Sequence, residues 1–383
     1  MKINKLPPSS YLAHTSLFKC AITLLQNYLN SLGYKAQIHF ELEGCLQFDK
    51  NLPQQSVLDF TAINEHLRQM SIDGEIVSEY WQNQWEYVSL FNGQSPLKEA
   101  DNLVRAIDIL PKLFQQHHAK LGVNNTLIQP VVWCGDKGKL AQGSAQIFTH
   151  DDRAIHIPNA VQLNVSVLNN KGQNLVAEAA FGEYLQQCFL RTSLESCLLY
   201  LPEKAAFERL ALKTHFGLAQ ELCSPIDISG GHQGSVALYR KLGKHNQHMG
   251  EQVLLYDQYH QVLSAQHNWQ KTARIEHRLG ASSKLYNPYA NVIYALLNVI
   301  DAIGAYEKNA LSLENLYETT ALPISLYTSE AGQGAVELFQ QSIWFNQSLN
   351  SIQKSAPMLD CPADLGDTIK QAILANYQVA LPS

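Results

Sequence analysis

Glutamates alternate with apolar residues in two segments of this chain. In the stretch FELEGCLQF, Glu41 and Glu43 lie two positions apart, and in NQWEYV the residues Gln84 and Glu86 flank Trp85. Successive side chains of a β-strand point to opposite faces, so each pair shares one face. The spacing predicts two strands that each carry carboxylates on one face and apolar side chains on the other.

Two later segments show the same alternation. The polar side chains at alternate positions of AVQLNVSVL and ARIEHRL are Gln162, Asn164, Ser166, Arg274, Glu276 and Arg278. Such alternation usually means the solvated face of a half-buried strand. These faces, however, concentrate Glu, Gln, Asn and Arg instead of a mixture with Thr, Ser and Lys. This composition also suits a hydrated cavity that holds ions, and both interpretations stay open.

A cavity of this kind has a definite chemistry. Carboxylates that crowd together repel one another unless cations lie between them. Oxygen ligands without cysteine favour Mg²⁺ or Mn²⁺, which are held by a few carboxylates and by substrate phosphates. Arginines present planar forks that match phosphate or carboxylate groups. Together these groups indicate phosphoryl transfer from a nucleotide such as ATP.

Composition narrows the class of protein. The chain has 383 residues, of which 46% are hydrophobic and 16% are charged, so we expect a folded globular protein. Its net charge of −6 argues against nucleic acid as a partner. We find no apolar run near the roughly 20 residues of a membrane span and no signal peptide. Seven scattered cysteines without a CxxC pair predict buried thiols in a reducing cytoplasm, with neither a disulfide framework nor a zinc site.

The hydrophobic pattern predicts both helices and strands. Helices are expected over 15–32, from 95 onward with a kink or restart at Pro111 and an end at Gly122, over 287–306, and through much of the C-terminal third. Strands are expected over 35–48, 75–91, 160–168, 235–240 and 272–278, and an irregular insertion over 133–158. This order favours an α+β fold with a mainly antiparallel, curved sheet flanked by helices.

Four segments resemble motifs of the glutamine synthetase family, in the family's order. FELEGCLQF is similar to its E-x-E strand, and SEYWQNQWEYVSLFNGQSPLKEADNLVRAIDIL to its Gln-aromatic-Glu and Ala-Asp-Asn motif. ARIEHRLGASSKLYNPYANVIYALLNVIDAI is similar to its R-I-E-x-R and Asn-Pro-Tyr segment, and LENLYETTALPISL to its Leu-Pro-x-Ser-Leu stretch. The resemblance runs in patches from about residue 20 to 378 and implies an ATP- and Mg²⁺-dependent carboxylate–amine ligase.

The resemblance also implies roles for particular residues. Metal ligands would be Glu41, Glu43, Glu79, Glu86, Gln162 and Glu276, with the first metal on Glu43, Glu79 and Glu86. Nucleotide-binding residues would be Arg274, Asn164, Ser166 and Arg240. Arg278 and Glu276 would be catalytic, with Arg278 against the substrate carboxylate or its acyl-phosphate.

Several departures from the family pattern favour an alternative. Gln162 stands where the family has a metal-ligand histidine, which puts a second metal in doubt. In the segment GGHQGSVALYR, Ser235 and Arg240 match the family's phosphate-binding motif, but its first two arginines are missing. The flap glutamate has no clear counterpart, and Glu221 is a poor candidate. A catalytically degenerate homologue that binds a metabolite or a partner protein is therefore the second hypothesis, and phosphagen-type or glutamate–cysteine-type chemistry is a third.

The resemblance also bears on domain organisation. We expect a helical lead-in over 1–34 and a catalytic domain over 35–383, without the family's small N-terminal domain. The family's ring with shared sites is then not expected, although another homo-oligomer is possible. The histidines are not expected to bind metal: His39, His156, His232 and His277 are isolated, and the adjacent His117 and His118 point about 100° apart on a helix.

Overall fold

The computed structural model describes residues 14–48, 59–79, 83–133, 156–211, 235–241, 255–256, 262–263, 269–308, 322–356 and 361–378. These residues form an α+β fold around one sheet of order β2-β3-β1-β7-β11-β8, with β4 also paired to β1. The strands are β1 (Tyr34–Phe48), β2 (Gly74–Ser78), β3 (Gln84–Ser89), β4 (Val123–Leu127), β7 (Ala160–Asn169), β8 (Val236–Tyr239) and β11 (Arg274–Ala281). Every described pairing in the sheet is antiparallel, as the sequence predicts.

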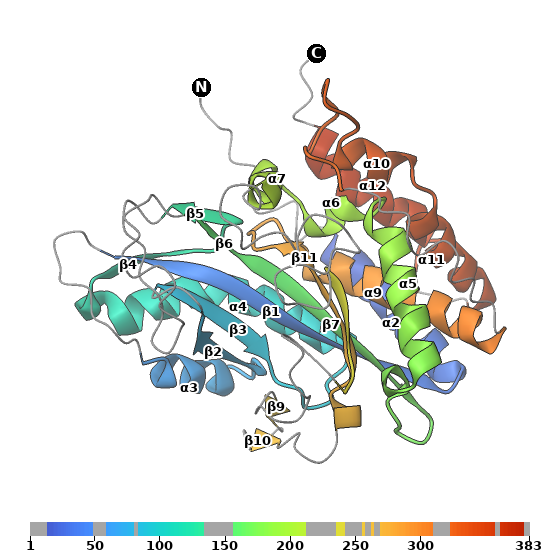
Figure 1. The fold of residues 1–383 in the computed structure, drawn as a ribbon, viewed down its shortest axis with the longest axis horizontal. Helices are drawn as coiled ribbons and strands as arrows, with labels where there is room; N and C mark the ends of the chain where they lie inside the picture. The colour runs from blue at the N-terminus through green and yellow to red at the C-terminus, as the bar shows by residue number, and fades with distance from the viewer. Residues whose placement is uncertain are drawn as a thin grey trace.

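Helices cover one face of this sheet (Figure 1). The α-helices are α2 (Thr15–Ser31), α3 (Thr61–Gln69), α4 (Pro96–His118), α5 (Ala179–Ser193), α6 (Cys197–Tyr200), α7 (Lys204–Ala211), α9 (Pro288–Glu307), α10 (Ala335–Gln341), α11 (Trp344–Ser355) and α12 (Leu365–Gln378). Short 3₁₀ turns are η1 (Ala119–Leu121), η2 (Leu175–Ala177) and η6 (Trp269–Lys271), and small sheets pair β5 (Val131–Trp133) with β6 (His156–Pro158) and β9 (Leu255–Tyr256) with β10 (Val262–Leu263). The C-terminal helices α10 to α12 gather at one end of the molecule, beside α2 and α9.

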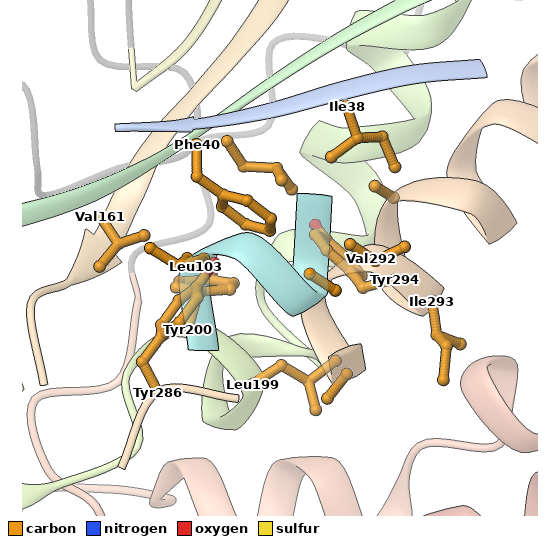
Figure 2. Close-up of a cluster of buried hydrophobic side chains, with 14 of the residues drawn as sticks. Ile38, Phe40, Leu103, Val161, Leu199, Tyr200, Tyr286, Val292, Ile293 and Tyr294 are labelled. Atoms are coloured by element: carbon orange, nitrogen blue, oxygen red, sulfur yellow. The ribbon is translucent and has the colours of Figure 1, made fainter. Parts of the chain in front are cut away.

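The core lies between the sheet and the helices. Figure 2 shows Ile38 and Phe40 pointing from β1 toward α4 and α9, where Leu103 and Tyr294 meet them. Each fully buried side chain of this size contributes roughly 1.5–3 kcal/mol through the hydrophobic effect. This burial fixes the register of β1, because a shift by one residue would turn Ile38 and Phe40 away from the helices.

Helix α9 is the central helix of this core. Pro288 occupies its first position, and the side chain of Asn287 caps it by accepting a hydrogen bond from the backbone nitrogen of Ala290 at 3.1 Å. Among the described residues it alone has the length and apolar composition of a membrane span, but 72% of that stretch is buried inside the fold. Such burial is typical of the core helix of a globular domain.

Two predictions about individual segments need correction, and a third is described only at its ends. The strand expected over 75–91 is a hairpin of β2 and β3, because the backbone nitrogen of Glu79 donates to the Gln84 carbonyl at 3.2 Å and the chain reverses there. Helix α4 continues through Pro111, which does not restart it. The insertion expected over 133–158 lies mostly outside the described residues, and its two ends pair as β5 and β6.

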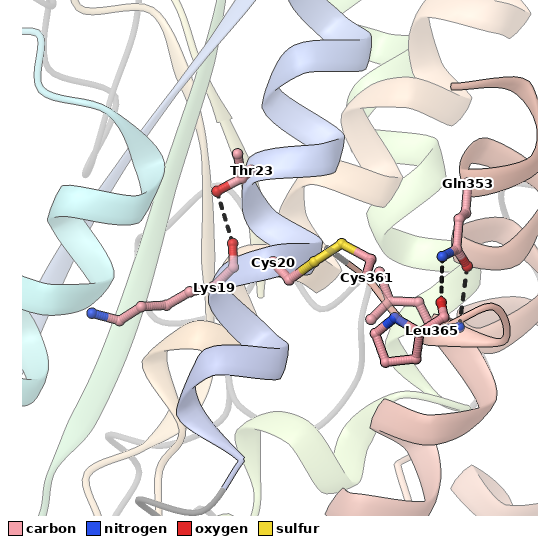
Figure 3. The surroundings of a disulfide bond; sticks show 7 residues. Lys19, Cys20, Thr23, Gln353, Cys361 and Leu365 are labelled. Carbon is pink, nitrogen blue, oxygen red and sulfur yellow. Dashed lines mark hydrogen bonds between the residues drawn. A yellow bond between two sulfur atoms is a disulfide. The ribbon is translucent and has the colours of Figure 1, made fainter. Parts of the chain in front are cut away.

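The cysteine prediction was wrong for one pair. Cys20 on α2 and Cys361, just before α12, form a disulfide across 341 positions of sequence (Figure 3). Their Cα atoms lie 6.2 Å apart, within the normal range for such a bond. The pairing has no local sequence signal, since it arises only when α12 packs against α2. The other described cysteines, Cys45, Cys188 and Cys197, are buried thiols that are not part of a disulfide, as expected.

Candidate active site

The sheet register brings the predicted polar residues together on the face opposite the helices. Glu41 lies opposite Gln162 on the neighbouring strand β7, and Glu43 lies opposite Glu86 on β3. Asn164 of β7 lies opposite Glu276 of β11. Four strands that are distant in sequence therefore contribute to one continuous polar surface, as their alternation predicted.

A chain of hydrogen bonds crosses three of these strands. The amide of Asn164 donates to Glu41 Oε1 at 2.9 Å and accepts from Arg274 Nε at 2.7 Å. Arg274 Nη2 donates in turn to Glu276 Oε2 at 3.0 Å. Asn164 thus has both of its amide groups engaged, and it fixes Glu41 relative to the arginine on β11.

Glu276 and Arg278 extend this network on β11. Arg278 Nη1 donates to Glu276 Oε1, so the two oxygens of this carboxylate contact two different arginines. The same nitrogen lies 3.4 Å from Gln162 Oε1 and 3.4 Å from the hydroxyl oxygen of Tyr239. Only 3% of Glu276 and 5% of Arg278 is exposed, so these opposite charges neutralise one another away from bulk water.

Glu43 has a separate set of contacts at the other end of the polar surface. Its Oε2 atom accepts from the backbone nitrogen of Ala160 at 2.8 Å and from Gln84 Nε2 at 3.3 Å. Gln84 is held by a second hydrogen bond, to Asn159 Oδ1 at 3.1 Å. These contacts hold the Glu43 carboxylate beside its cross-strand neighbour Glu86.

The electrostatics of Glu41 reflect its burial. Desolvation raises the pKa of Glu41 and the negative charge of Glu276 raises it further, while Arg274 and the hydrogen bond from Asn164 lower it. Burial also raises the pKa of Tyr239, with a further contribution from Glu276. Tyr239 is therefore a neutral phenol at physiological pH.

The remaining predicted residues have other positions or partners. Ser166 is on the same face but donates to Gln37 Oε1 at 3.1 Å. Arg240 Nη2 donates to the carbonyl of Ala177 at 3.0 Å, beside α5, so its contact is with the helical layer. Glu79 directly follows β2, at the turn into β3. Glu221 and His232 lie outside the described residues.

The described histidines predicted as non-ligands have ordinary partners. His39 Nδ1 lies 3.3 Å from Glu99 Oε1, and His277 Nε2 lies 3.3 Å from Ser193 Oγ. Of the adjacent pair, His117 contacts His66, whereas His118 contacts a backbone carbonyl.

Sequence reasoning missed one candidate residue of the site and one buried arginine apart from it. Tyr239 pairs with Arg274 in the β8–β11 register, and the Arg274 guanidinium lies over its ring, 5.1 Å from the centroid. Arg209 is a nearly fully buried arginine on α7 whose Nη1 donates to the Leu279 carbonyl at 3.3 Å. Alternation along VALY could have placed Tyr239 on the polar face, whereas Arg209 had no signal beyond its apolar neighbours.

The donor sets fit the implied metals unequally. Glu43 and Glu86 are directly opposite each other on neighbouring strands. Protein sites commonly hold Mg²⁺ with one or two carboxylates, and water and phosphate supply the other ligands. For the second metal, Glu276 and Gln162 already accept hydrogen bonds from arginine. Within the described ranges, no group of three or more His, Cys, Asp or Glu side chains is placed to hold a metal ion. The two carboxylates of Glu43 and Glu86 therefore fit one metal if water and phosphate complete its ligands, whereas arginine occupies the oxygens of the second position.

Comparison with solved structures identifies the fold. A structure described as a novel glutamine synthase homolog aligns with 95% of this chain and 72% of its own, at 16% identity and a TM-score of 0.54. A complex of GmaS with ADP and an apo form of GmaS each align with 96% of this chain and 75% of their own, at 14% identity and a TM-score of 0.55. No family model and no curated protein matches the sequence. At these identities the comparison concerns architecture: the chain has the fold of glutamine synthetase homologues.

Proposed function

We propose that this protein is an ATP- and Mg²⁺-dependent carboxylate–amine ligase that acts on an amino acid or amine through an acyl-phosphate. The observation that carries the proposal is that the Glu43–Glu86 pair and the Arg274–Glu276–Arg278 cluster share one sheet face. Carboxylates for a hard cation beside guanidinium groups for phosphate are the groups that phosphoryl transfer requires. The GmaS structure with ADP supports nucleotide binding by this fold.

The reaction would proceed in two steps. A carboxylate oxygen of the first substrate attacks the γ-phosphorus of ATP, and ADP leaves. The amine nitrogen of the second substrate then attacks the acyl carbon, phosphate leaves, and the nitrogen gives up a proton. When bound, the divalent ion neutralises phosphate charge. The need for ATP favours a cytoplasmic location, although the Cys20–Cys361 disulfide is unusual in that reducing compartment.

Each residue of the cluster has a part in this scheme. Arg274, on the partly exposed side of the cluster, would bind nucleotide phosphates. Arg278 would stabilise charge on the acyl-phosphate, and Glu276 would orient both arginines because it bridges them. Glu43 and Glu86 would hold the metal that contacts the phosphates.

An ADP-release assay tests this function. Purified protein is incubated with ATP and Mg²⁺ and with panels of amino acids, other carboxylates, alkylamines and polyamines. Release should require one carboxylate and one amine together, and Glu86→Gln should abolish it. Glu183→Gln, which changes an exposed glutamate on α5, should leave it unchanged. ADP release that does not depend on the added carboxylate and amine, or that persists in Glu86→Gln, contradicts the proposal.

One observation favours the second candidate, a non-catalytic homologue. The donors of Arg274 and Arg278 that would meet phosphate instead contact Glu276, Asn164 and Gln162 of the same chain. A ligand must compete with these contacts. Binding of ADP with no release for any substrate pair would support this candidate over the ligase.

A further inference from the structure

Arg278 lies in the position where a second metal ion would be expected. Its Nη1 atom is surrounded by oxygen atoms from three strands: Gln162 Oε1 on β7, the Tyr239 hydroxyl on β8 and Glu276 Oε1 on its own strand β11. A carboxylate, an amide and a phenol around one positive centre resemble the hard-oxygen ligand set of a divalent cation.

The same position involves Glu41. Glu41 pairs directly with Gln162 across β1 and β7, and it hydrogen-bonds Asn164, which is opposite Glu276. Glu41, Gln162 and Glu276 are the residues that the family resemblance assigns to the second metal. A guanidinium nitrogen at hydrogen-bonding distance prevents an ion from reaching the metal–oxygen distance of about 2.0–2.1 Å that Mg²⁺ needs.

Tyr239 keeps the guanidinium groups in place. Its ring packs under Arg274, 5.1 Å from the guanidinium carbon, and its hydroxyl accepts from Arg278. The side chain is nearly fully buried and forms one wall of the cluster. Among the described residues, the guanidinium groups of Arg274 and Arg278 and the carboxylates of Glu41 and Glu276 thus lie in one connected cluster.

We propose that Arg278 is a built-in substitute for the second divalent ion, so that this site takes one metal, at Glu43 and Glu86, and receives its other positive charge from the chain. This proposal rests on the proposed function for the identity of the site. The positive charge of Arg278 is then present at every Mg²⁺ concentration. Removal of the guanidinium would leave Glu276, Glu41 and Gln162 as an open oxygen site for a cation.

A Mn²⁺ titration followed by electron paramagnetic resonance, without nucleotide, tests this directly. Arg278→Met should bind one additional Mn²⁺ ion per chain relative to wild type, and the double variant Arg278→Met/Glu276→Gln should lose it again. Arg278→Lys, which retains a cation, and Arg68→Met, which removes an exposed arginine on α3, should bind as many ions as wild type. Circular dichroism confirms that each variant is folded.

Equal Mn²⁺ counts for Arg278→Met and wild type would overturn the proposal. If Arg278→Met does not fold, Mn²⁺ counts on proteins that keep Arg278 decide. A bound ion that remains in Glu43→Gln/Glu86→Gln but is lost in Glu276→Gln would show a second metal site and overturn the proposal. Absence of such an ion supports the proposal. The counts are made without ATP. Failure of the ligase proposal would therefore appear separately, as missing ADP release with unchanged Mn²⁺ counts.

Discussion

Glu276 and Arg274 lie two positions apart on β11, and the arginine Nη2 donates to Glu276 Oε2 at 3.0 Å. Because Arg278 contacts the other oxygen, this carboxylate is the centre of the charged cluster. Strand β11 thus supplies both the carboxylate and the guanidinium groups of the cluster. The neighbouring strands β7 and β8 supply the amide and phenol groups that contact them.

Neutralising Glu276 should destabilise the fold. Glu276→Gln would leave two arginine side chains without their common carboxylate, and loss of one partner of a buried ion pair costs about 3–5 kcal/mol. We expect a loss near the lower end, because the glutamine amide still offers an oxygen. Urea unfolding measures the change, with Glu183→Gln as the exposed control on α5. A loss no larger than that of the control would contradict the role of Glu276.

The two groups of Tyr239 should be separable by mutation. Tyr239→Phe keeps the ring under Arg274 and removes only the hydroxyl near Arg278, whereas Tyr239→Leu removes the ring as well. Cation–π contacts contribute about 0.5–2 kcal/mol. Calorimetry should therefore show ADP affinity reduced by up to about 30-fold in the leucine variant and much less in the phenylalanine variant. Equal losses in both would mean that the ring does not position Arg274.

Glu99 predicts a pH dependence of stability away from the site. It is fully buried near His39, Tyr87, Ser89 and Asp73, and desolvation raises its pKa above the usual 4.5. The folded state then holds the proton more tightly than the unfolded state. Its contribution to stability is present below about pH 4.5 and is lost as pH rises through the folded-state pKa.

Comparison with Glu99→Gln isolates this effect. The unfolding free energy of wild type, measured in urea from pH 4 to 8, should fall relative to that of the variant as pH increases. The two proteins differ only at this side chain, so the slope of the difference with pH is the readout. A difference that stays constant across this range would show that Glu99 does not titrate abnormally.

The Cys20–Cys361 disulfide should stabilise the packing of α12 on α2. A disulfide that closes a long loop contributes about 2–4 kcal/mol, mainly by restricting the unfolded chain. Reduction with dithiothreitol should lower the melting temperature of wild type, and it should have no effect on the Cys20→Ser/Cys361→Ser variant. Equal responses of the two proteins would show that the pair is not linked in solution.

The sequence predicted the strands of the site well because its polar alternation is regular. Glu41, Glu43, Asn164 and Glu276 share a face as expected, since a buried apolar face opposite them fixes the register. The hairpin of β2 and β3 was missed because apolar residues continue through both strands.

Alternation of polar and apolar residues could not predict which side chains would form hydrogen bonds with one another. It placed Arg274 and Arg278 on the polar face but gave no sign that Glu276 would engage both, or that Tyr239 would lie between them. Arg240, predicted from a loop motif, instead contacts Ala177 of η2, because it directly follows the end of β8 and is one position out of phase with Tyr239. The Cys20–Cys361 pair depends on helix packing that no local pattern encodes.

The most direct measurement of the central claim is isothermal titration calorimetry of ADP and a non-hydrolysable ATP analogue, with and without Mg²⁺. We predict binding that requires Mg²⁺, is lost in Glu43→Gln/Glu86→Gln and is retained in Glu183→Gln. Absence of any binding at millimolar nucleotide with Mg²⁺ would contradict a nucleotide site on this face of the sheet.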